Sequence, residues 1–373
     1  MKHLSACRLC GGNMHLGLQL QPMPLVDDYD TGPAAELYPT ELLRCADCGL
    51  VQLSVVMPPA MLFGGYSYRT GHSPGLVRHF RDYAAEIGER AGLTQASLAI
   101  DIGANDGTLL RELRDRTGCA VLGIDPCPPS GDIPMRRAEL TPDLAGEILA
   151  ECGPADLVTA NNVLAHVDDL AGMLRAARMV LRPGGWFACE VGSLEAMCAA
   201  RVWETVYHEH LSYFDAHTLA SALRGAGLWP GEIRRVETHG GSLRAICRRV
   251  PGGLPPPSPD ARPDLAVLPA NVATRGAKLR ELRADNAVAF GASAKASVIL
   301  WQTGLRPSAV IDDNPLKQGK RMPGTNIPVV NRKAIAGADR LLVLAWNELP
   351  AIAAALPEFA GRLIVAAPEP YLA

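Results

Sequence analysis

Four cysteines are the first residues of this chain whose types and spacing could do chemistry. They form two Cys-x-x-Cys pairs with 34 residues between the pairs, Cys7/Cys10 and Cys45/Cys48. A glycine follows each pair, Gly11 and Gly49, and permits a tight turn around the thiolates. Four thiolates suit tetrahedral zinc and leave no open coordination position, so we predict a structural zinc site. A redox dithiol and a chance spacing are the alternatives.

A second group of reactive side chains lies in one short segment, Tyr207, His208, Glu209 and His210. A histidine with a pKa near neutrality beside a carboxylate suits acid–base catalysis. The two histidines lack the i, i+4 spacing that places two metal ligands on one helix face, although a metal site remains an alternative. A buried structural cluster is another, because apolar and aromatic residues flank the segment.

Acidic and amide residues follow a series of apolar runs in the middle of the chain. The run at 97–102 contains Asp101 and continues into the Gly-x-x-x-Gly turn 103–107, and a helix is expected from Thr108. Asp125 ends the next run, where a carboxylate can accept both hydroxyls of a ribose. These segments resemble the S-adenosylmethionine-binding motifs of class I methyltransferases; an ordinary capped turn and a nicotinamide site are the alternatives. The expected cofactor-binding residues here are Asp101, Gly103, Asn105, Gly107, Asp125 and Asn161.

A similar turn occurs near the end of the chain, at residues 290–295. Lys295 could contact a diphosphate there, assisted by Ser293 and by backbone N–H groups. The alternative is a packing turn with an exposed lysine, since this turn has a single glycine.

The elements that position these residues are predicted from the apolar periodicity. Short apolar runs alternate with helical patterns, which indicates parallel βαβ units and an α/β fold. We expect a zinc-binding module over 1–60, a doubly wound, Rossmann-like methyltransferase domain over 61–250 and a second Rossmann-like domain over 265–373. A stretch rich in proline and glycine at 250–259 reads as the linker.

Composition excludes several classes of protein. The 373 residues are 48% hydrophobic and 20% charged, with a net charge of −3, which argues against disorder and against a basic surface for nucleic acid. We see no signal peptide and no run of about 18 apolar residues that could span a membrane. We therefore expect a cytoplasmic enzyme with no nucleic-acid or membrane partner, and a monomer as the simplest assembly.

The whole pattern resembles the NDP-sugar C-methyltransferases of deoxysugar biosynthesis. The matching segments are the four cysteines and residues 65–68, 101–110, 161–166, 207–214, 239–244, 290–295, 311–320 and 323–325. The resemblance implies S-adenosylmethionine as cofactor, structural zinc, and methylation of carbon 3 of a nucleotide-linked 4-keto-6-deoxy sugar.

The resemblance also implies roles for single residues. His210 is the expected base for the C3 proton, Glu209 would orient or charge-stabilise it, and Tyr207 and His166 would donate hydrogen bonds to the O4 oxyanion. For Tyr207, Glu209 and His210 all to serve one site, their segment must be loop-like or bulged. Tyr66 and Tyr68 are expected to fold over the cofactor, or else only to pack.

Two other functions stay open at this stage. The chain could methylate an oxygen or nitrogen of a sugar or other small metabolite, or it could be an inactive binding protein with the same fold.

Overall fold

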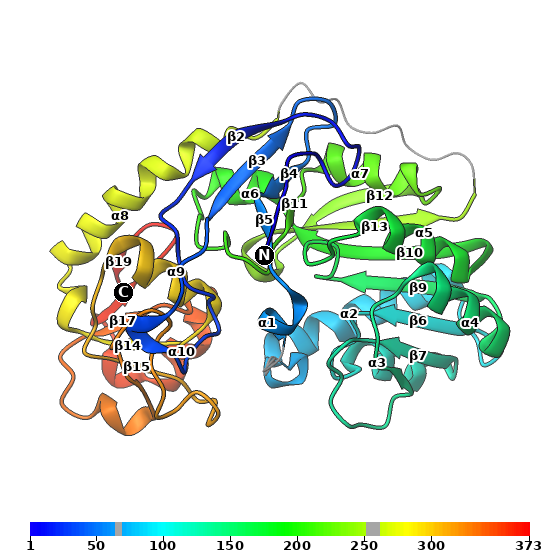
Figure 1. Cartoon of the computed structure of the whole chain (residues 1–373). Coiled ribbons are helices and arrows are strands. Elements are labelled where there is room, and N and C mark those ends of the chain that lie inside the picture. The colour runs from blue at the N-terminus through cyan, green and yellow to red at the C-terminus, as the bar shows by residue number, and fades with distance from the viewer. Residues whose placement is uncertain (64–68, 251–261) are drawn as a thin grey trace.

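The computed structural model describes residues 1–63, 69–250 and 262–373 of the chain. Tyr66, Tyr68 and most of the predicted linker therefore lie outside the described residues. Two α/β lobes lie side by side, and the N-terminal strands lie across the top between them (Figure 1).

A seven-stranded sheet forms the larger lobe, with the order β12-β13-β10-β9-β6-β7-β8. Its strands, from the edge inward and out again, are β12 (Trp229–Val236), β13 (Ser242–Arg248), β10 (Leu181–Gly192), β9 (Ala155–Asn161), β6 (Leu98–Ile102), β7 (Ala120–Ile124) and β8 (Met135–Arg136). The strands from β10 to β8 run parallel, whereas β13 pairs antiparallel with both β10 and β12. This architecture confirms the predicted class I methyltransferase fold.

Helices cover both faces of this sheet because its strands are apolar on both sides. Ala99 of β6 packs with α2 (Pro74–Ala91) and α3 (Thr108–Thr117), whereas its neighbour Ile100 packs with the cluster of α4, α5 and α7. The latter helices are α4 (Pro142–Cys152), α5 (Leu170–Val180) and α7 (Ala216–Gly225). The helix α2 ends at the left-handed C-cap Gly92.

The N-terminal strands form a four-stranded sheet of the order β11-β4-β3-β2. Its members are β2 (Met14–Gln19), β3 (Glu41–Cys45), β4 (Val51–Leu53) and β11 (Ser212–Tyr213), while β1 (Lys2–His3) pairs with β5 (Val55–Val56) and α1 (Pro59–Phe63) follows. The strand β11 comes from the middle of the chain, directly after His210. The zinc-binding module that we expected over 1–60 therefore shares its sheet with the segment that carries the reactive histidine.

The second lobe is a six-stranded sheet, parallel except at one edge, with the order β16-β15-β14-β17-β18-β19. Its strands are β14 (Val288–Phe290), β15 (Ala309–Ile311), β16 (Val329–Val330), β17 (Leu341–Val343), β18 (Leu363–Val365) and β19 (Tyr371–Leu372). Its helices are α8 (Pro269–Glu281), α9 (Ala294–Thr303) and α10 (Leu349–Ala355). A second Rossmann-like arrangement was predicted from the strand–helix rhythm and is present.

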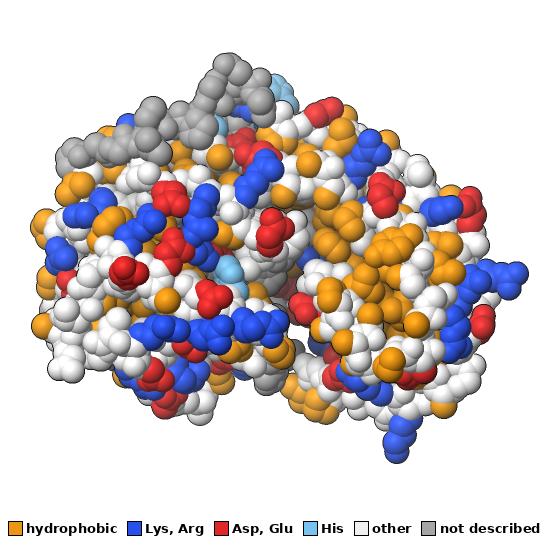
Figure 2. Space-filling model, turned by 180° about the vertical axis from the view of Figure 1, so that it is seen from behind, with side chains coloured by type: hydrophobic (Ala, Val, Ile, Leu, Met, Phe, Trp, Pro, Cys, Tyr) orange, Lys and Arg blue, Asp and Glu red, His pale blue; other side chains and the backbone are white. Residues whose placement is uncertain are grey.

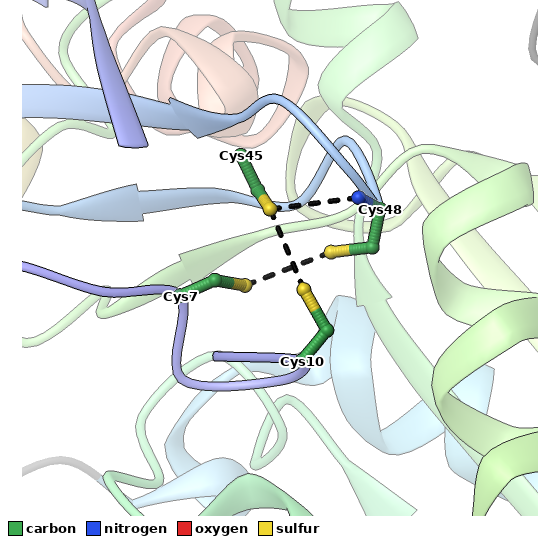
Figure 3. A group of neighbouring side chains, drawn as sticks. All are labelled: Cys7, Cys10, Cys45 and Cys48. Atoms are coloured by element: carbon green, nitrogen blue, oxygen red, sulfur yellow. Dashed lines mark hydrogen bonds between the residues drawn. The ribbon is translucent and has the colours of Figure 1, made fainter. Parts of the chain in front are cut away.

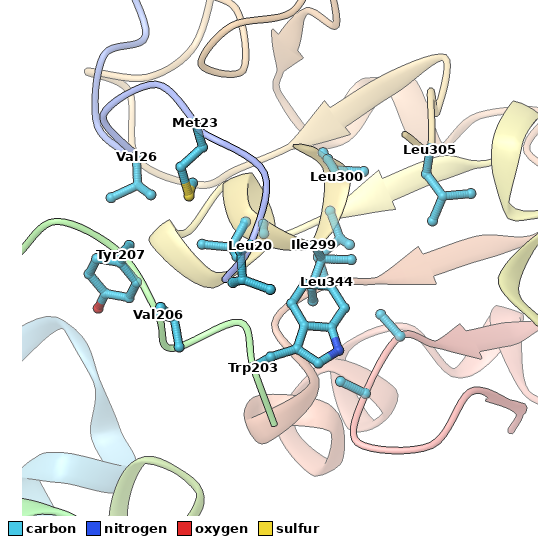
Figure 4. Packing of buried hydrophobic residues seen from close by; sticks show 14 of the residues in the cluster. Leu20, Met23, Val26, Trp203, Val206, Tyr207, Ile299, Leu300, Leu305 and Leu344 are labelled. Atoms are coloured by element: carbon cyan, nitrogen blue, oxygen red, sulfur yellow. The ribbon is translucent and has the colours of Figure 1, made fainter. Parts of the chain in front are cut away.

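A single apolar cluster joins three distant parts of the chain (Figure 4). Trp203, Val206 and Tyr207 pack against Leu20, Met23 and Val26 from the N-terminal region and against side chains of α9 and the second sheet. Residues 21–31, which we call the strap, also hydrogen-bond to the second lobe: Tyr29 donates to the Ala292 carbonyl (2.7 Å), and Ser297 donates to that of Val26 (3.0 Å). The reactive segment thus lies where the three parts meet.

Candidate functional site

One large cavity collects most of the predicted site residues. It measures about 1470 Å³ and lies between the carboxyl edges of the two sheets, with the strap and the 205–213 segment as further walls. Seen from behind, the molecular surface is hollowed between the two lobes, and side chains of both charge signs are interspersed over that face (Figure 2). The carboxyl edges of parallel strands are the usual ligand-binding edges of such sheets.

The turn after β6 brings its backbone close to this cavity. Gly103 has a left-handed φ of +68°, and a Cβ there would meet Val163 Cγ2 at 2.2 Å, so a larger residue would strain the backbone and displace Val163. Asn105 is also left-handed (φ 50°), and its N–H donates to Asp125 Oδ2 (2.9 Å). The second Asp125 oxygen accepts the Cys127 N–H (2.7 Å), which holds the carboxylate rigidly at the cavity wall.

Asp101 and Asn161 supply the remaining polar wall of this side. Burial raises the pKa of Asp101 to about 7, although the hydroxyl of Thr159 donates to Oδ1 (2.6 Å). Both amide atoms of Asn161 are buried, and neither has a hydrogen-bond partner among the described residues. Unsatisfied buried polar atoms cost free energy, so a cavity lined by them suits a hydrogen-bonding ligand.

Gly107 has a structural task at the start of α3, and its cofactor contact stays a prediction. It is the left-handed N-cap of α3, and a Cβ there would meet Ile133 Cγ1 at 2.7 Å. Among the described residues that line the cavity, Gly107 is absent. Its neighbour Asp106, which we did not predict, accepts the Gly71 N–H (2.7 Å) and both donors of Thr108, so that residues 70–71 dock on the glycine turn.

His79 of α2 is a further cavity residue that sequence reasoning missed. Its Nε2 lies 2.9 Å from Glu190 Oε2, and Arg244 donates to the other oxygen of that carboxylate (Nε–Oε1, 2.6 Å). Burial by itself raises the pKa of Glu190, but the hydrogen bond from His79 and the charge of Arg244 outweigh it, so the net pKa is lowered.

The 207–210 segment is a turn, in which the His210 N–H donates to the Tyr207 carbonyl (3.0 Å), and this confirms the expected loop-like geometry. The His210 ring has a neighbour at each nitrogen: Nδ1 lies 2.8 Å from the Thr205 carbonyl, and Nε2 lies 3.1 Å from the Tyr207 hydroxyl. A carbonyl can only accept, so Nδ1 carries the hydrogen and Nε2 is the basic atom of the neutral ring.

His166 lies beside His210, with ring centroids 5.0 Å apart at an angle of 69°. Burial lowers the pKa of His166 to about 4, so this ring is neutral at physiological pH. Its Nδ1 is buried with no hydrogen-bond partner among the described residues. His166 lines the cavity, and a neutral imidazole with an unsatisfied nitrogen is a candidate hydrogen-bonding group.

The predicted role of Glu209, to orient or charge-stabilise His210, stays a prediction. The Thr205 carbonyl orients His210, whereas Glu209 feels the charges of Asp27 and Lys317 on the opposite wall. Burial, followed by the repulsion from Asp27, raises the pKa of Glu209 to about 8. A carboxyl group with a pKa above neutrality keeps its proton at neutral pH and can donate a hydrogen bond into the cavity that it lines. His208 is turned the other way, toward the Pro39 carbonyl (3.1 Å).

Ser293 and Lys295 line the cavity from the second lobe. The Ser293 hydroxyl is the N-cap acceptor of α9, bound by the Ala296 N–H (3.3 Å), so its oxygen is already engaged by the helix. The Lys295 ammonium lies 5.3 Å from the centroid of the Trp346 ring, and burial lowers the pKa of this lysine. A partly desolvated cation at a helix start suits an anionic ligand.

The four predicted metal ligands converge, with their sulfur atoms pointing toward one another (Figure 3). All four Sγ atoms lie within 4.8 Å of one another, and the Cys7–Cys48 and Cys10–Cys45 separations are 3.6 and 3.5 Å. Tetrahedral zinc with bonds of about 2.3 Å separates its sulfur ligands by about 3.8 Å, so the cluster fits zinc. The left-handed glycines Gly11 and Gly49 close both turns, as their spacing predicts.

No helix in the described part of the chain is long and apolar enough to cross a membrane.

Comparison with known protein families divides the chain into three matched regions. Residues 7–63 match the family described as a putative zinc binding domain, and residues 76–229 match a methyltransferase domain. Residues 275–368 match the family described as a C-methyltransferase C-terminal domain.

Individual relatives match either the full length of the chain or one part of it. The C-methyltransferase NovU of Streptomyces niveus is 29% identical, over 99% of this chain and 97% of its own length. A ubiquinone biosynthesis O-methyltransferase of Burkholderia ambifaria is 31% identical, but over only 38% of this chain and 68% of its own length. Among solved structures, a 1,6-didemethyltoxoflavin-N1-methyltransferase of Burkholderia thailandensis is 18% identical, over 54% of this chain and 96% of that one, with a TM-score of 0.36, which is too low to bear on substrate. The similarity over the full length is thus to a carbon methyltransferase, whereas the other two cover about half of this chain or less.

Proposed function

We propose that this chain, which belongs to the S-adenosylmethionine-dependent C-methyltransferases with an N-terminal zinc-binding domain, methylates carbon 3 of a nucleotide-linked 4-keto-6-deoxy sugar. The observation that carries the proposal is the shared cavity, whose walls include the cofactor edge of the first sheet, the His166–His210 pair and the Ser293–Lys295 turn.

S-adenosylmethionine is the methyl donor, and the residues of the first sheet edge suit it. Asp125 would accept the ribose hydroxyls, and Asp101 would face the charged end of the cofactor. Asn161 offers an amide whose donor and acceptor atoms lack partners among the described residues. When bound, the cofactor supplies an electrophilic methyl group, and the chain must supply a carbon nucleophile.

The carbon nucleophile would come from acid–base chemistry at His210. A hydrogen on the carbon beside a ketone is acidic because its loss gives an enolate. Nε2 of His210 is the basic atom, and in this scheme it accepts the C3 hydrogen as a proton while the C–H electron pair becomes the enolate. The new Nε2–H can then donate to the Tyr207 hydroxyl oxygen, which frees the Tyr207 hydrogen to point at the enolate oxygen.

The nucleotide end of the substrate would lie against the second lobe, and an internal repeat supports this. Asp312 ends β15 and accepts the Ala292 N–H at Oδ2 (2.8 Å) and the Asn314 N–H at Oδ1 (2.9 Å). Asp125 makes the same pair of contacts, at the same sequence separations, in the cofactor lobe. A rigid carboxylate that lines the same cavity as Lys295 matches a sugar hydroxyl next to a diphosphate. We further propose a cytoplasmic location, since buried cysteines such as Cys189 and Cys247 suit a reducing compartment.

The test is to incubate the enzyme in deuterium oxide with TDP-, CDP- and GDP-linked 4-keto-6-deoxy sugars, with and without S-adenosylmethionine. We expect deuterium at C3 without the cofactor and a new C–CH₃ group with it, as read by mass spectrometry and NMR. Replacing His210 with Asn should abolish both reactions while leaving cofactor affinity nearly unchanged, because the change removes only the base. A methyl group on oxygen, or full exchange in the His210→Asn variant, would contradict the proposal.

A further inference from the structure

Arg8 lies between two zinc ligands, yet its side chain binds the methyltransferase lobe. Its Nη1 donates to the Val167 carbonyl (2.6 Å) and to that of Asp168 (3.1 Å). Its Nη2 donates to the Leu211 carbonyl (2.6 Å) and to the Ser212 hydroxyl. One guanidinium therefore binds two loops that are more than 40 residues apart in sequence.

These two loops are the ones that carry the histidine pair. Val167 directly follows His166, and Leu211 directly follows His210. The loops also contact each other, because the N–H groups of Leu211 and Ser212 both donate to the Ala165 carbonyl (2.7 and 3.1 Å). The His166 ring also hydrogen-bonds to the Glu209 backbone, and Arg8 adds four contacts to this junction.

The turn between Cys7 and Cys10, together with the other two zinc-ligating cysteines, is called the zinc knuckle, and it holds Arg8 in place. Its backbone N–H donates to Gln52 Oε1 (2.9 Å), and the Gln52 amide donates back to the Ala6 carbonyl (3.2 Å). Cys7 and Cys10 flank it on either side, so bound zinc would fix the backbone from which the guanidinium extends. A planar fork of several N–H donors can span two sets of acceptors, which the single ammonium of lysine does not.

We propose that Arg8 is a positioning residue for the methyl-transfer reaction: it fixes His166 relative to His210, so that the zinc knuckle shapes the acid–base site as well as stabilising the N-terminal region. This inference rests on the proposed roles of the two histidines. The knuckle would act through Arg8 and would make no contact with substrate.

The test compares Arg8→Gln and Arg8→Lys with Lys2→Ala in the full chain. Lys2 makes an exposed ion pair with Asp168, 3.2 Å from Nζ to Oδ2, and so contacts the same loop without joining it to the other. We expect both Arg8 variants to keep their zinc, to bind S-adenosylmethionine within about twofold of the original affinity and to lose about 10²-fold in kcat, since small displacements of reacting groups cost that much. Lys2→Ala should retain full kcat.

A second readout does not depend on turnover. NMR titration of ring-labelled histidine should show the pKa of His166 rising from about 4 toward its ordinary value in Arg8→Gln, because the loosened loops admit water. This readout still decides the role of Arg8 if the ketosugar proposal fails. Unchanged kcat and an unchanged His166 pKa in Arg8→Gln would overturn the inference, and so would a loss of cofactor affinity and zinc in parallel with kcat.

Discussion

At the scale of single residues, the orientation of His210 depends on a backbone carbonyl. The Thr205 oxygen fixes the Nδ1–H tautomer, but it carries no full negative charge with which to stabilise an imidazolium. A neutral carbonyl thus holds the ring in one orientation without placing a second charge at Nδ1.

Glu209 yields a prediction about the pH dependence of stability. Its pKa is raised from 4.5 to about 8 in the folded chain, so the folded state binds an extra proton between these pH values. The contribution of this bound proton to the free energy of unfolding is complete below pH 4.5 and disappears as the pH rises through 8. We expect Glu209→Gln to melt at nearly the same temperature as the original chain at pH 4 and at a higher temperature at pH 9. Asp101 is present in both proteins, so its raised pKa cancels in this comparison. The same difference in melting temperature between variant and original chain at both pH values would contradict the raised pKa of Glu209.

At the scale of elements, the zinc knuckle supports the strands β3 and β4 and, through Arg8, the histidine loops. Replacing Cys45 with Ser should abolish stoichiometric zinc binding and lower the melting temperature, because metal binding contributes directly to folding free energy. Cys152→Ser is the matched control, since this exposed cysteine lies at the end of α4, outside the four-cysteine cluster. Metal content by atomic spectroscopy and thermal melting provide the measurements. A Cys45→Ser chain that keeps its zinc would show that the cluster is not the metal site.

Sequence periodicity predicted the parallel strands of the two large sheets well, because buried parallel strands are short apolar runs that end in polar residues at one edge. Asp101, Asp125 and Asn161 were found by that rule. The strand β11 could not be found in this way, since a strand of two residues has no period. Thr205 was missed for a different reason: it acts through its carbonyl, which every residue possesses. Arg8 was hidden between two cysteines whose spacing already explained the segment.

At the scale of the whole molecule, a buried ion pair ties the reactive segment to the second lobe. Arg275 of α8 donates to Glu204 (Nη1–Oε2, 2.6 Å), and both side chains are fully buried. Its other terminal nitrogen donates to the Arg201 carbonyl (2.8 Å). Residues 201–210 are thus fixed from both lobes, which places the histidine at the boundary between cofactor and substrate.

Breaking this pair should be costly. Arg275→Met leaves the Glu204 charge buried and should lower the stability by about 3–5 kcal/mol, as measured by urea unfolding. The double variant Glu204→Leu/Arg275→Met should recover most of the loss, because an apolar pair needs no desolvation of charge. Lys278→Ala, which removes an exposed pair with Glu281 on the same helix, should cost less than about 1 kcal/mol. Equal losses in the single and double variants would mean that packing, not charge, holds this junction.

The strap has a consequence for the order in which parts of the protein fold. Gln21 exchanges hydrogen bonds with Gln302, 281 positions later, and Met23 and Val26 belong to an apolar cluster that includes residues of the second lobe. During synthesis, the apolar side chains of the strap stay partly uncovered until α9 and the strands around it have been translated. The strap therefore reaches its final position only after the second lobe has been translated, although it lies near the start of the chain.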